Sequence, residues 1–121
     1  MKKLFYLSTC STCKRIMGEL SPALDDFDQQ DIKTENITAE QLDQMHARSG
    51  SYESLFSRKA MKFRSMGLAD QDLLEADYRQ LILDEYTFLK RPVFILDDKI
   101  FIGSAKAEVE RLTRLLEDLS D

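Results

Sequence analysis

The chain has 121 residues, with 22 acidic and 17 basic side chains and a formal net charge of −5. This length fits one domain that folds without a metal or disulfide scaffold, and the acidity argues against direct binding of nucleic acid. No apolar run approaches the ~18 residues of a membrane-spanning helix, and the apolar stretch after Met1 is too short for a secretion signal; we therefore expect a cytoplasmic protein with no membrane partner.

The chain begins with a predicted strand followed by a helix. Residues Lys3–Leu7 form a short apolar and aromatic run, which predicts a buried strand. From Ser11 to Leu24 the apolar residues recur at spacings of three and four, which predicts a helix with one buried face. The two cysteines of the chain, Cys10 and Cys13, therefore lie where the strand ends and the helix begins.

Three interpretations of this CxxC pair remain open: half of a zinc site, a redox pair, or two ordinary thiols. A structural zinc site takes four protein ligands, and the chain can add only His46 and carboxylates; we expect no metal and place His46 on a helix surface. A structural disulfide is rare in a reducing compartment. The position at a strand-to-helix junction favours the redox pair.

The start of a helix suits a reactive thiolate. Backbone N–H groups without helical partners point outward there, and the helix dipole adds positive charge. Lys14 and Arg15 follow immediately, and such surroundings lower a thiol pKa. Cys10 is nearest the helix end, so we assign it as the nucleophile, and Cys13 is the resolving thiol three residues on.

The middle of the chain is predicted to be helical after one more strand. Weak apolar evidence places that strand at Asp31–Ile37. Thr38-Ala39-Glu40-Gln41 fits a capping box, so a helix should begin near Ala39 and end at Ser49-Gly50-Ser51. We expect amphipathic helical packing with a basic face over Tyr52–Met66, a turn closed by Gly67, and a further helix at Asp70–Leu83, whose apolar stripe is Leu73, Leu74, Leu81 and Ile82.

The last third of the chain predicts a hairpin and a helix. Val93–Leu96 and Lys99–Ile102 are strands joined by a turn at Asp97-Asp98. Gly103 ends the second strand, and Ser104 is the predicted cap of the last helix. The apolar face of that helix comprises Val109, Leu112, Leu115, Leu116 and Leu119.

The order of these elements is β-α-β, a helical middle, then β-β-α. It is typical of an α/β protein with a thioredoxin-like fold: a four-stranded mixed sheet flanked by helices. Residues 1–37 and 87–121 would form the core, and 38–86 a helical insertion. A proline directly before an inward strand of such a fold predicts a cis Arg91–Pro92 bond; the alternative is a trans proline that starts an edge strand.

Four segments together resemble one family across nearly the whole chain. They are Tyr6-Leu7-Ser8-Thr9-Cys10-Ser11-Thr12-Cys13-Lys14, Phe56-Ser57-Arg58-Lys59, Leu89-Lys90-Arg91-Pro92-Val93 and Ile102-Gly103. In this order and spacing they resemble the arsenate reductase (ArsC)/Spx family of thioredoxin-fold proteins. The resemblance implies that Cys10 is the nucleophile that attacks arsenate, and that Arg58 and Arg91 hold the oxyanion, with Lys14 as a further candidate.

Arg58 and Arg91 are chemically suited to oxyanion binding, because arginine keeps its charge and can bind two oxygens at once. An ordinary surface cation is the alternative for each. The chain departs from the reductases, which usually carry serine and arginine at the positions of Cys13 and Lys14. Where a third oxyanion arginine is expected, it has Gly103-Ser104-Ala105-Lys106.

The CxxC pair and Gly103 resemble Spx instead, a redox-sensing regulator that binds the RNA polymerase alpha subunit. Two functional hypotheses follow. One is a thiol oxidoreductase without a bound cofactor that takes a small anionic substrate or thiol adduct and is reduced by glutathione and glutaredoxin. The other is an Spx-like regulator with RNA polymerase alpha as its partner. A third alternative is a thioredoxin-fold protein whose cysteine pair is oxidised only incidentally.

Overall fold

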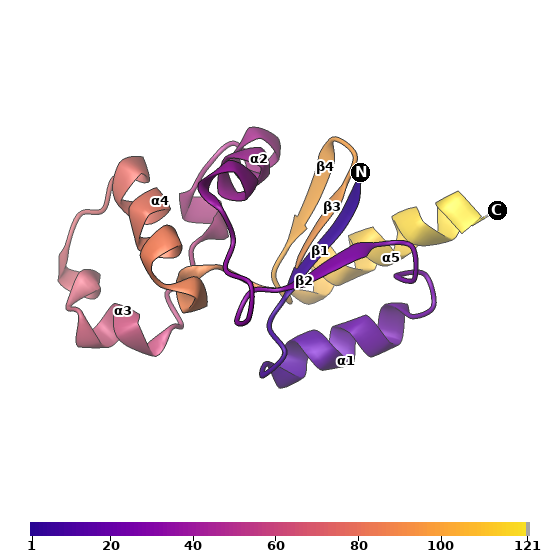
Figure 1. Ribbon diagram of the computed structural model, residues 1–121, viewed down its shortest axis with the longest axis horizontal. Coiled ribbons are helices and arrows are strands. Elements are labelled where there is room, and N and C mark those ends of the chain that lie inside the picture. Colours follow the sequence, from indigo (N-terminus) through magenta and orange to yellow (C-terminus); the bar gives the residue numbers. More distant parts are fainter. Residues whose placement is uncertain (121) are drawn as a thin grey trace. The chain divides into compact units, whose positions relative to one another are not determined.

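The structure is a computed structural model that describes residues 1–120 (Figure 1). The chain folds as two compact units. The first unit comprises residues 1–35 and the chain from Arg91 onward, and the second comprises Asn36–Lys90. Within residues 1–120, no helix combines the length and the apolar character that crossing a membrane requires.

The first unit is built on a four-stranded sheet. Its strands are β1 (Lys2–Tyr6), β2 (Asp28–Asp31), β3 (Val93–Leu96) and β4 (Lys99–Ile102). They lie in the order β2-β1-β3-β4, with β1 parallel to β2 and antiparallel to β3, and with β3 antiparallel to β4. The predicted mixed sheet and the predicted hairpin are both confirmed.

Helices α1 (Ser11–Leu20) and α5 (Lys106–Ser120) pack against one face of this sheet (Figure 1). Leu4, Phe94 and Phe101 share that face because they are direct cross-strand partners. The cluster that they form with the helices comprises Leu4, Ile16, Leu20, Leu24, Phe27, Phe94, Leu96, Phe101, Leu112 and Leu116. Leu119 is exposed, so the predicted apolar face of the last helix was one residue too long.

The first helix is shorter than predicted. It ends at Leu20, and Ser21 already has extended backbone angles (φ −67°, ψ 143°). Pro22 lacks a backbone N–H and disfavours helical geometry in the residue before it, which stops the helix. Leu24 is nevertheless buried in the core, as its place in the apolar pattern indicated.

The second strand was predicted too late in the chain. It is Asp28–Asp31, a polar segment at the edge of the sheet, whereas Ile32 and Ile37 are buried outside any strand. Only Gln30 of this strand is buried, so the strand has no apolar face that an alternating pattern could have marked. The Ile32 N–H still donates to the Tyr6 carbonyl at 2.9 Å, directly beyond the end of the pairing.

Strand β4 forms the other edge of the sheet, and side chains of α5 bond two of its outward backbone groups. The Glu108 carboxylate accepts the Ile102 N–H at 2.9 Å, and Arg111 Nη2 donates to the Ile100 carbonyl at 3.1 Å. The Arg111 guanidinium also lies over the Phe101 ring, 4.1 Å from its centroid. The prediction that Ser104 caps this helix was wrong, because the Ala105 carbonyl accepts the first helical N–H groups and the helix starts at Lys106.

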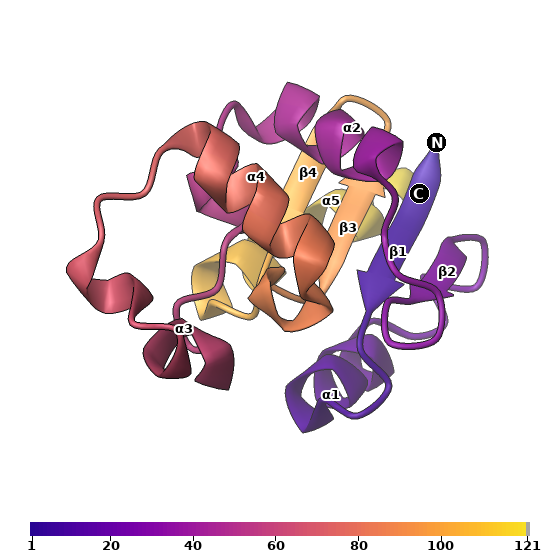
Figure 2. The same ribbon diagram turned by 60° about the vertical axis from the view of Figure 1, so that its left-hand side comes forward.

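The second unit contains three helices and three short 3-10 turns (Figure 2). The elements are α2 (Ala39–Ser49), η1 (Glu53–Leu55), α3 (Met61–Ser65), η2 (Leu68–Asp70), α4 (Glu75–Asp84) and η3 (Tyr86–Phe88). The capping box at the start of α2 is confirmed: Thr38 Oγ1 accepts the Gln41 N–H, and the Gln41 side chain accepts the Thr38 N–H. Gly50 ends α2 in the left-handed region (φ 82°).

Two helical predictions for this unit were wrong in extent. The helical packing predicted over Tyr52–Met66 is limited to η1 and α3, because the backbone between them pairs with the segment before β3: Ser57 N–H donates to Phe88 O at 2.7 Å. The helix predicted from Asp70 starts at Glu75 instead. Its first turn is closed by the Asp77 carboxylate, which accepts the Leu74 N–H at 2.8 Å, and the Leu74 side chain is exposed.

Phe56 is central to the apolar core of the second unit. It is fully buried, its ring stacks on Phe88 with centroids 4.9 Å apart, and it contacts Tyr78 and Phe63 through tilted and edge-on rings.

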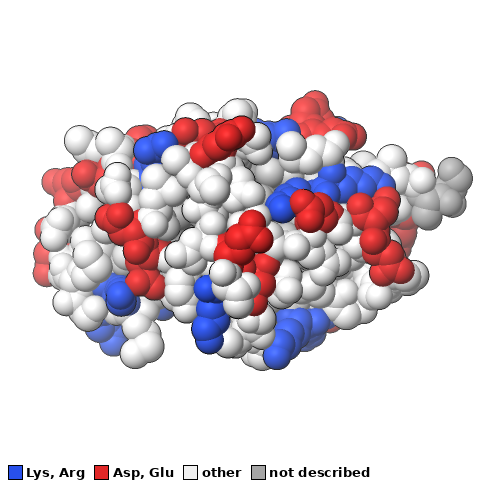
Figure 3. All heavy atoms as spheres, in the orientation of Figure 1, with Lys and Arg blue, Asp and Glu red and all other residues white. Residues whose placement is uncertain are grey.

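On the molecular face drawn in Figure 3, acidic and basic side chains are interspersed.

Candidate functional site

The loop between β1 and α1 places Cys10 at the start of a helix. The Cys10 N–H donates to the Leu7 carbonyl at 3.0 Å, which closes a turn directly after the strand. The Cys10 carbonyl accepts the Lys14 N–H at 3.2 Å, the first bond of α1, while the backbone of Cys10 itself is extended (φ −94°, ψ 112°). Cys10 is therefore the N-cap residue of α1, which agrees with its predicted place where the strand ends and the helix begins.

Asp31 fixes the same loop from β2. Its Oδ1 accepts the backbone N–H of Ser8 at 3.2 Å and that of Lys33 at 3.1 Å. The Ser8 hydroxyl also bonds this carboxylate, and together these donors hold the pKa of Asp31 below its usual value. The sequence reasoning missed this residue. The bond from the Lys33 N–H to Asp31 is an Asx turn, and the signal in the sequence was an aspartate at the start of a loop, where such turns are common.

The two cysteines are free thiols in different surroundings: Cys10 is partly exposed and Cys13 is fully buried. Burial raises the pKa of Cys10, but hydrogen bonds from the Cys13 N–H, the Cys13 thiol and Arg91 outweigh it, so the net pKa lies below the ordinary 9.0. The pKa of Cys13 is raised to about 11, mainly by burial, and the neighbouring Cys10 contributes in the same direction. The geometry thus favours a thiolate at Cys10 and a protonated thiol at Cys13.

Arg91 is the cation next to Cys10. Its guanidinium bonds the Cys10 sulfur and contributes positive charge beside it. The Arg91–Pro92 bond is cis, as predicted, and the Pro92 carbonyl accepts the Gly103 N–H at 2.8 Å. Gly103 has a φ of 82°, in the left-handed region that glycine adopts without strain. The first unit therefore brings Cys10, Cys13 and Arg91 together, and ties Pro92 to Gly103.

The other predicted site residues have different surroundings. The Lys14 side chain is exposed, and the contact of Lys14 with Cys10 is through its backbone N–H. Arg58 belongs to the second unit, where it is about half exposed and bonds Glu53 and Tyr78, each at 2.8 Å. Arg58 lines a cavity of about 720 Å³ in that unit, together with Lys59, Ala60, Met61, Phe63, Arg64, Gly67, Ala69 and Asp70.

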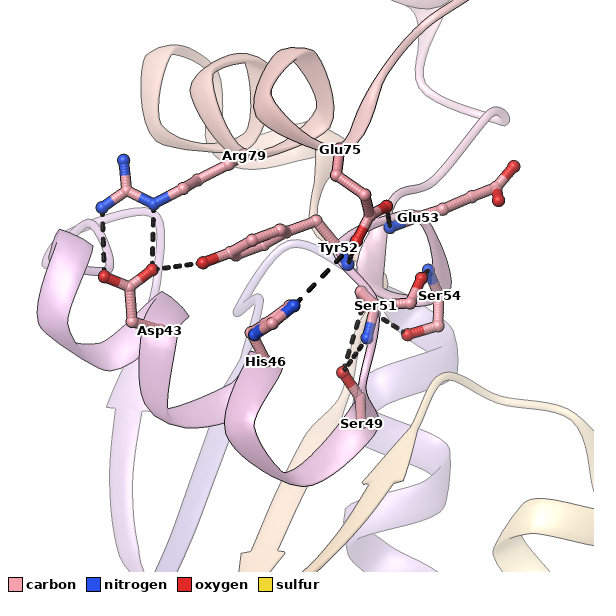
Figure 4. A network of polar contacts seen from close by, with 9 residues as sticks. All are labelled: Asp43, His46, Ser49, Ser51, Tyr52, Glu53, Ser54, Glu75 and Arg79. Carbon is pink, nitrogen blue, oxygen red and sulfur yellow. Dashed lines mark hydrogen bonds and ion pairs between the residues drawn. The ribbon is translucent and has the colours of Figure 1, made fainter.

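His46 lies on α2 and is half-buried, with its ring stacked on Tyr52 at a centroid distance of 4.1 Å (Figure 4). Its Nε2 is 4.0 Å from Glu75 Oε1. His46 therefore packs against Tyr52 and Glu75 within the second unit. Within residues 1–120, no three side chains of the metal-ligating types gather closely enough to hold a metal ion.

Comparison with known proteins identifies relatives of the chain. The family model for the ArsC family matches residues 5–112. The global transcriptional regulator Spx of Lactiplantibacillus plantarum is 20% identical over 109 residues, which cover 89% of this chain and 83% of that protein.

Solved structures give the same result. The YFFB (PA3664) protein superposes with a TM-score of 0.80 at 25% identity, covering 96% of this chain and 99% of that one. An arsenate reductase (ArsC) related protein from Brucella melitensis gives a TM-score of 0.67 at 27% identity, covering 91% and 92%. These likenesses show a thioredoxin-like α/β fold and support a thiol-dependent redox function. The family model spans most of the chain, and the chain belongs to the ArsC family.

Proposed function

We propose that the protein is a thiol-dependent reductase in which the Cys10 thiolate attacks arsenate or a related oxidised substrate. The observation that carries the proposal is the paired environment of the two thiols. Cys10 is partly exposed, with its pKa lowered by hydrogen bonds from Cys13 and Arg91, and Cys13 is buried beside it with a pKa of about 11. Cys10 is thus suited to act as the nucleophile, and Cys13 stays protonated until it acts as the resolving thiol.

For arsenate, the chemistry balances with these two residues. The Cys10 thiolate forms an S–As bond, and an arsenate oxygen leaves as water after taking up protons. The Cys13 sulfur then attacks the Cys10 sulfur, and its proton passes to an arsenic-bound oxygen. The S–As bond breaks with its electron pair going to arsenic, which is released as arsenite. The Cys10–Cys13 disulfide that remains is reduced by two glutathione thiols through glutaredoxin.

The cationic side chains supply the anion-binding part of the proposal. Arg91 would stabilise the Cys10 thiolate by the hydrogen bond to its sulfur. Its permanent positive charge would also bind the oxyanion. Arg58 and Lys14 are the further anion-binding candidates, and no bound cofactor takes part.

The test is arsenate-dependent oxidation of NADPH in the presence of glutathione, glutaredoxin and glutathione reductase. Turnover should be lost in Cys10→Ser and strongly reduced in Arg91→Gln. Glu19→Gln, which removes one charge from an exposed ion pair with Arg15, is the matched control and should turn over like wild type. Turnover that stays at background, with Cys10→Ser equal to wild type, would exclude the enzyme.

A second candidate function is an Spx-like regulator, favoured by the likeness to the Lactiplantibacillus plantarum regulator and by the CxxC pair. Here the Cys10–Cys13 disulfide is a switch rather than an intermediate of turnover. Capture of purified RNA polymerase alpha subunit by the oxidised protein, and not by the reduced protein or by Cys13→Ser, would support it. Equal capture in both redox states would count against a switch.

A further inference from the structure

The carboxylate of Asp31 takes the place of a main-chain acceptor where β1 ends. Strands β1 and β2 are parallel, with Tyr6 opposite Asp31, and the Ile32 N–H donates to the Tyr6 carbonyl at 2.9 Å. The next bond of such a parallel ladder would run from the Ser8 N–H to the Ile32 carbonyl. The Ser8 N–H donates instead to Asp31 Oδ1, at 3.2 Å. The pairing of the two strands therefore finishes on a side chain.

The Ser8 N–H belongs to the same peptide group as the Leu7 carbonyl. That peptide bond is trans, and a trans peptide is planar, with its N–H and its C=O pointing in opposite directions. The Leu7 carbonyl accepts the Cys10 N–H at 3.0 Å. The bond to Asp31 on one side of this peptide therefore fixes the orientation of the acceptor that holds Cys10 on the other side.

Leu7 contacts both cysteines through its main chain. Its N–H donates to the Cys13 sulfur, and its carbonyl accepts the Cys10 N–H. The Cys10 sulfur is in turn bonded by Cys13 and Arg91. These bonds to the sulfur depend on the place of the Cys10 backbone. Rotation of the Leu7–Ser8 peptide would remove the acceptor of the Cys10 N–H, and the sulfur would then meet its donors less often.

We propose that Asp31 is a positioning residue for Cys10. Through the Leu7–Ser8 peptide, its carboxylate holds the Cys10 backbone where the sulfur meets the donors that favour a thiolate. Asp31 acts through the main chain and takes no part in the chemical steps. The proposal rests on the role of Cys10 as the nucleophile in the proposed function, whichever oxidised substrate Cys10 attacks.

The Asp31 carboxylate is itself held in place. Its Oδ1 also accepts the Lys33 N–H at 3.1 Å, and the Asp31 carbonyl accepts the Glu35 N–H at 2.9 Å. The Ser8 hydroxyl bonds the carboxylate as well, and together these donors hold the pKa of Asp31 below its usual value. Asp31 is therefore ionised throughout the pH range in which thiols titrate, and a charged acceptor forms stronger hydrogen bonds than a neutral one.

The negative charge of Asp31 has an opposing effect, since a charge of the same sign disfavours a nearby thiolate. Asp31 and Cys10 are both partly exposed, so water and salt weaken this repulsion. We expect the positioning effect to be the larger one. Loss of one hydrogen bond changes an equilibrium about two- to tenfold. Because a more basic thiolate is also more nucleophilic, the alkylation rate should change only about two- to threefold.

The experiment measures alkylation of Cys10 by iodoacetamide as a function of pH in the Cys13→Ser parent, to which Asp31→Ala or Asp31→Asn is added. Asparagine keeps an acceptor oxygen for the loop without the charge. Asp28→Ala is the matched control, because Asp28 lies on the same strand and its carboxylate bonds the Lys3 side chain, at 2.8 Å, rather than the loop backbone.

In Asp31→Ala the alkylation profile should move to higher pH, with a rate at pH 7.5 about two- to threefold below that of the parent. Asp31→Asn should react at a rate between those of Asp31→Ala and the parent, and Asp28→Ala should match the parent. An unchanged profile in Asp31→Ala would overturn the proposal, since Asp31 would then have only a structural role. Faster alkylation in both Asp31 variants would contradict it too, because charge repulsion would then dominate.

A measurement on the wild-type protein decides the question if Asp31→Ala does not fold. The backbone amide NMR signals of Ser8 and Cys10 are followed as the pH is lowered. Both signals should move with one midpoint below 3.8, the usual pKa of an aspartate, because one peptide group connects the two N–H groups to Asp31. Movement of the Ser8 signal alone would refute the connection to Cys10.

These readouts do not use arsenate. Failure of the turnover assay would therefore exclude the proposed reductase without deciding the role of Asp31, and the alkylation profiles would decide the role of Asp31 without deciding the substrate.

Discussion

The difference between the two thiols predicts a measurable difference in alkylation. The pKa of Cys10 lies below 9.0 and that of Cys13 is about 11, so at pH 7.5 the thiolate fraction of Cys10 should exceed that of Cys13 at least ~100-fold. A thiolate of lower pKa is intrinsically less nucleophilic, with a Brønsted slope of ~0.4–0.5, which reduces the ratio by about tenfold. A rate difference of at least ~10-fold should remain, and the burial of Cys13 should increase it.

The assay is alkylation by iodoacetamide as a function of pH in two single-cysteine variants. Cys13→Ser reports on Cys10, and its rate should rise with a midpoint below pH 9. Cys10→Ser reports on Cys13; it loses the contribution of the Cys10 thiol, but burial, the largest cause of the raised pKa, remains, so its rate should rise only at a higher pH than that of Cys13→Ser. In guanidinium chloride the two variants should react at similar rates, which is the control for intrinsic reactivity. If folded Cys10→Ser reacts as fast as folded Cys13→Ser at pH 7.5, the assigned roles of the two thiols are wrong.

Three further predictions address the groups around these thiols and the second unit. Arg91→Gln should raise the pKa of Cys10, because it removes a hydrogen bond and a positive charge that favour the thiolate; the same alkylation profile, recorded in the Cys13→Ser background, should move to higher pH. The pKa of Asp43 is lowered to about 2, mainly by the hydrogen bond from Arg79. The stabilising contribution of this carboxylate is thus present above pH ~4 and lost as the pH falls toward 2, so the melting temperature should fall more over that range in wild type than in Asp43→Asn. Phe56→Ala should lower the free energy of unfolding by about 3–5 kcal/mol, since the fully buried ring contacts three others; urea unfolding followed by circular dichroism measures it, and a loss below 1 kcal/mol would contradict the packing described.

Elements with strong local signals could be predicted from the sequence. The start of helix α2 is set by the capping box of Thr38 and Gln41, and its end by Gly50. Both signals come from residues close together in the sequence. The hairpin of β3 and β4 likewise follows from two apolar runs around Asp97-Asp98. In these segments local preference and tertiary structure agree.

Strand β2 shows where local signals fail. Its residues are Asp28-Gln29-Gln30-Asp31, and nothing in their side chains favours a strand. The segment is extended because β1 offers a row of backbone partners beside it, and that partner is distant in the sequence. Ile32 and Ile37, the apolar residues that suggested a strand at Asp31–Ile37, are buried, but burial does not specify backbone conformation.

The candidate site divides in the same way. Cys10 and Cys13 could be found because their spacing and their place before a helix are local properties. The buried state of Cys13 and the contact between Cys10 and Arg91 depend on segments about eighty residues apart in the chain. Glu53 and Tyr78 gave no signal, since a glutamate and a tyrosine 25 residues apart become a pair only through the packing of η1 and α4.

The covered edge of β4 limits how this chain can associate with other chains. An exposed edge strand is a template on which a second chain can add a strand of its own, by partner binding or by aggregation. Here the outward N–H of Ile102 and the carbonyl of Ile100 are already bonded by Glu108 and Arg111. An incoming strand would have to displace both side chains, as well as the arginine from the Phe101 ring. Along this edge, the side chains of α5 therefore oppose the addition of a strand from a second chain.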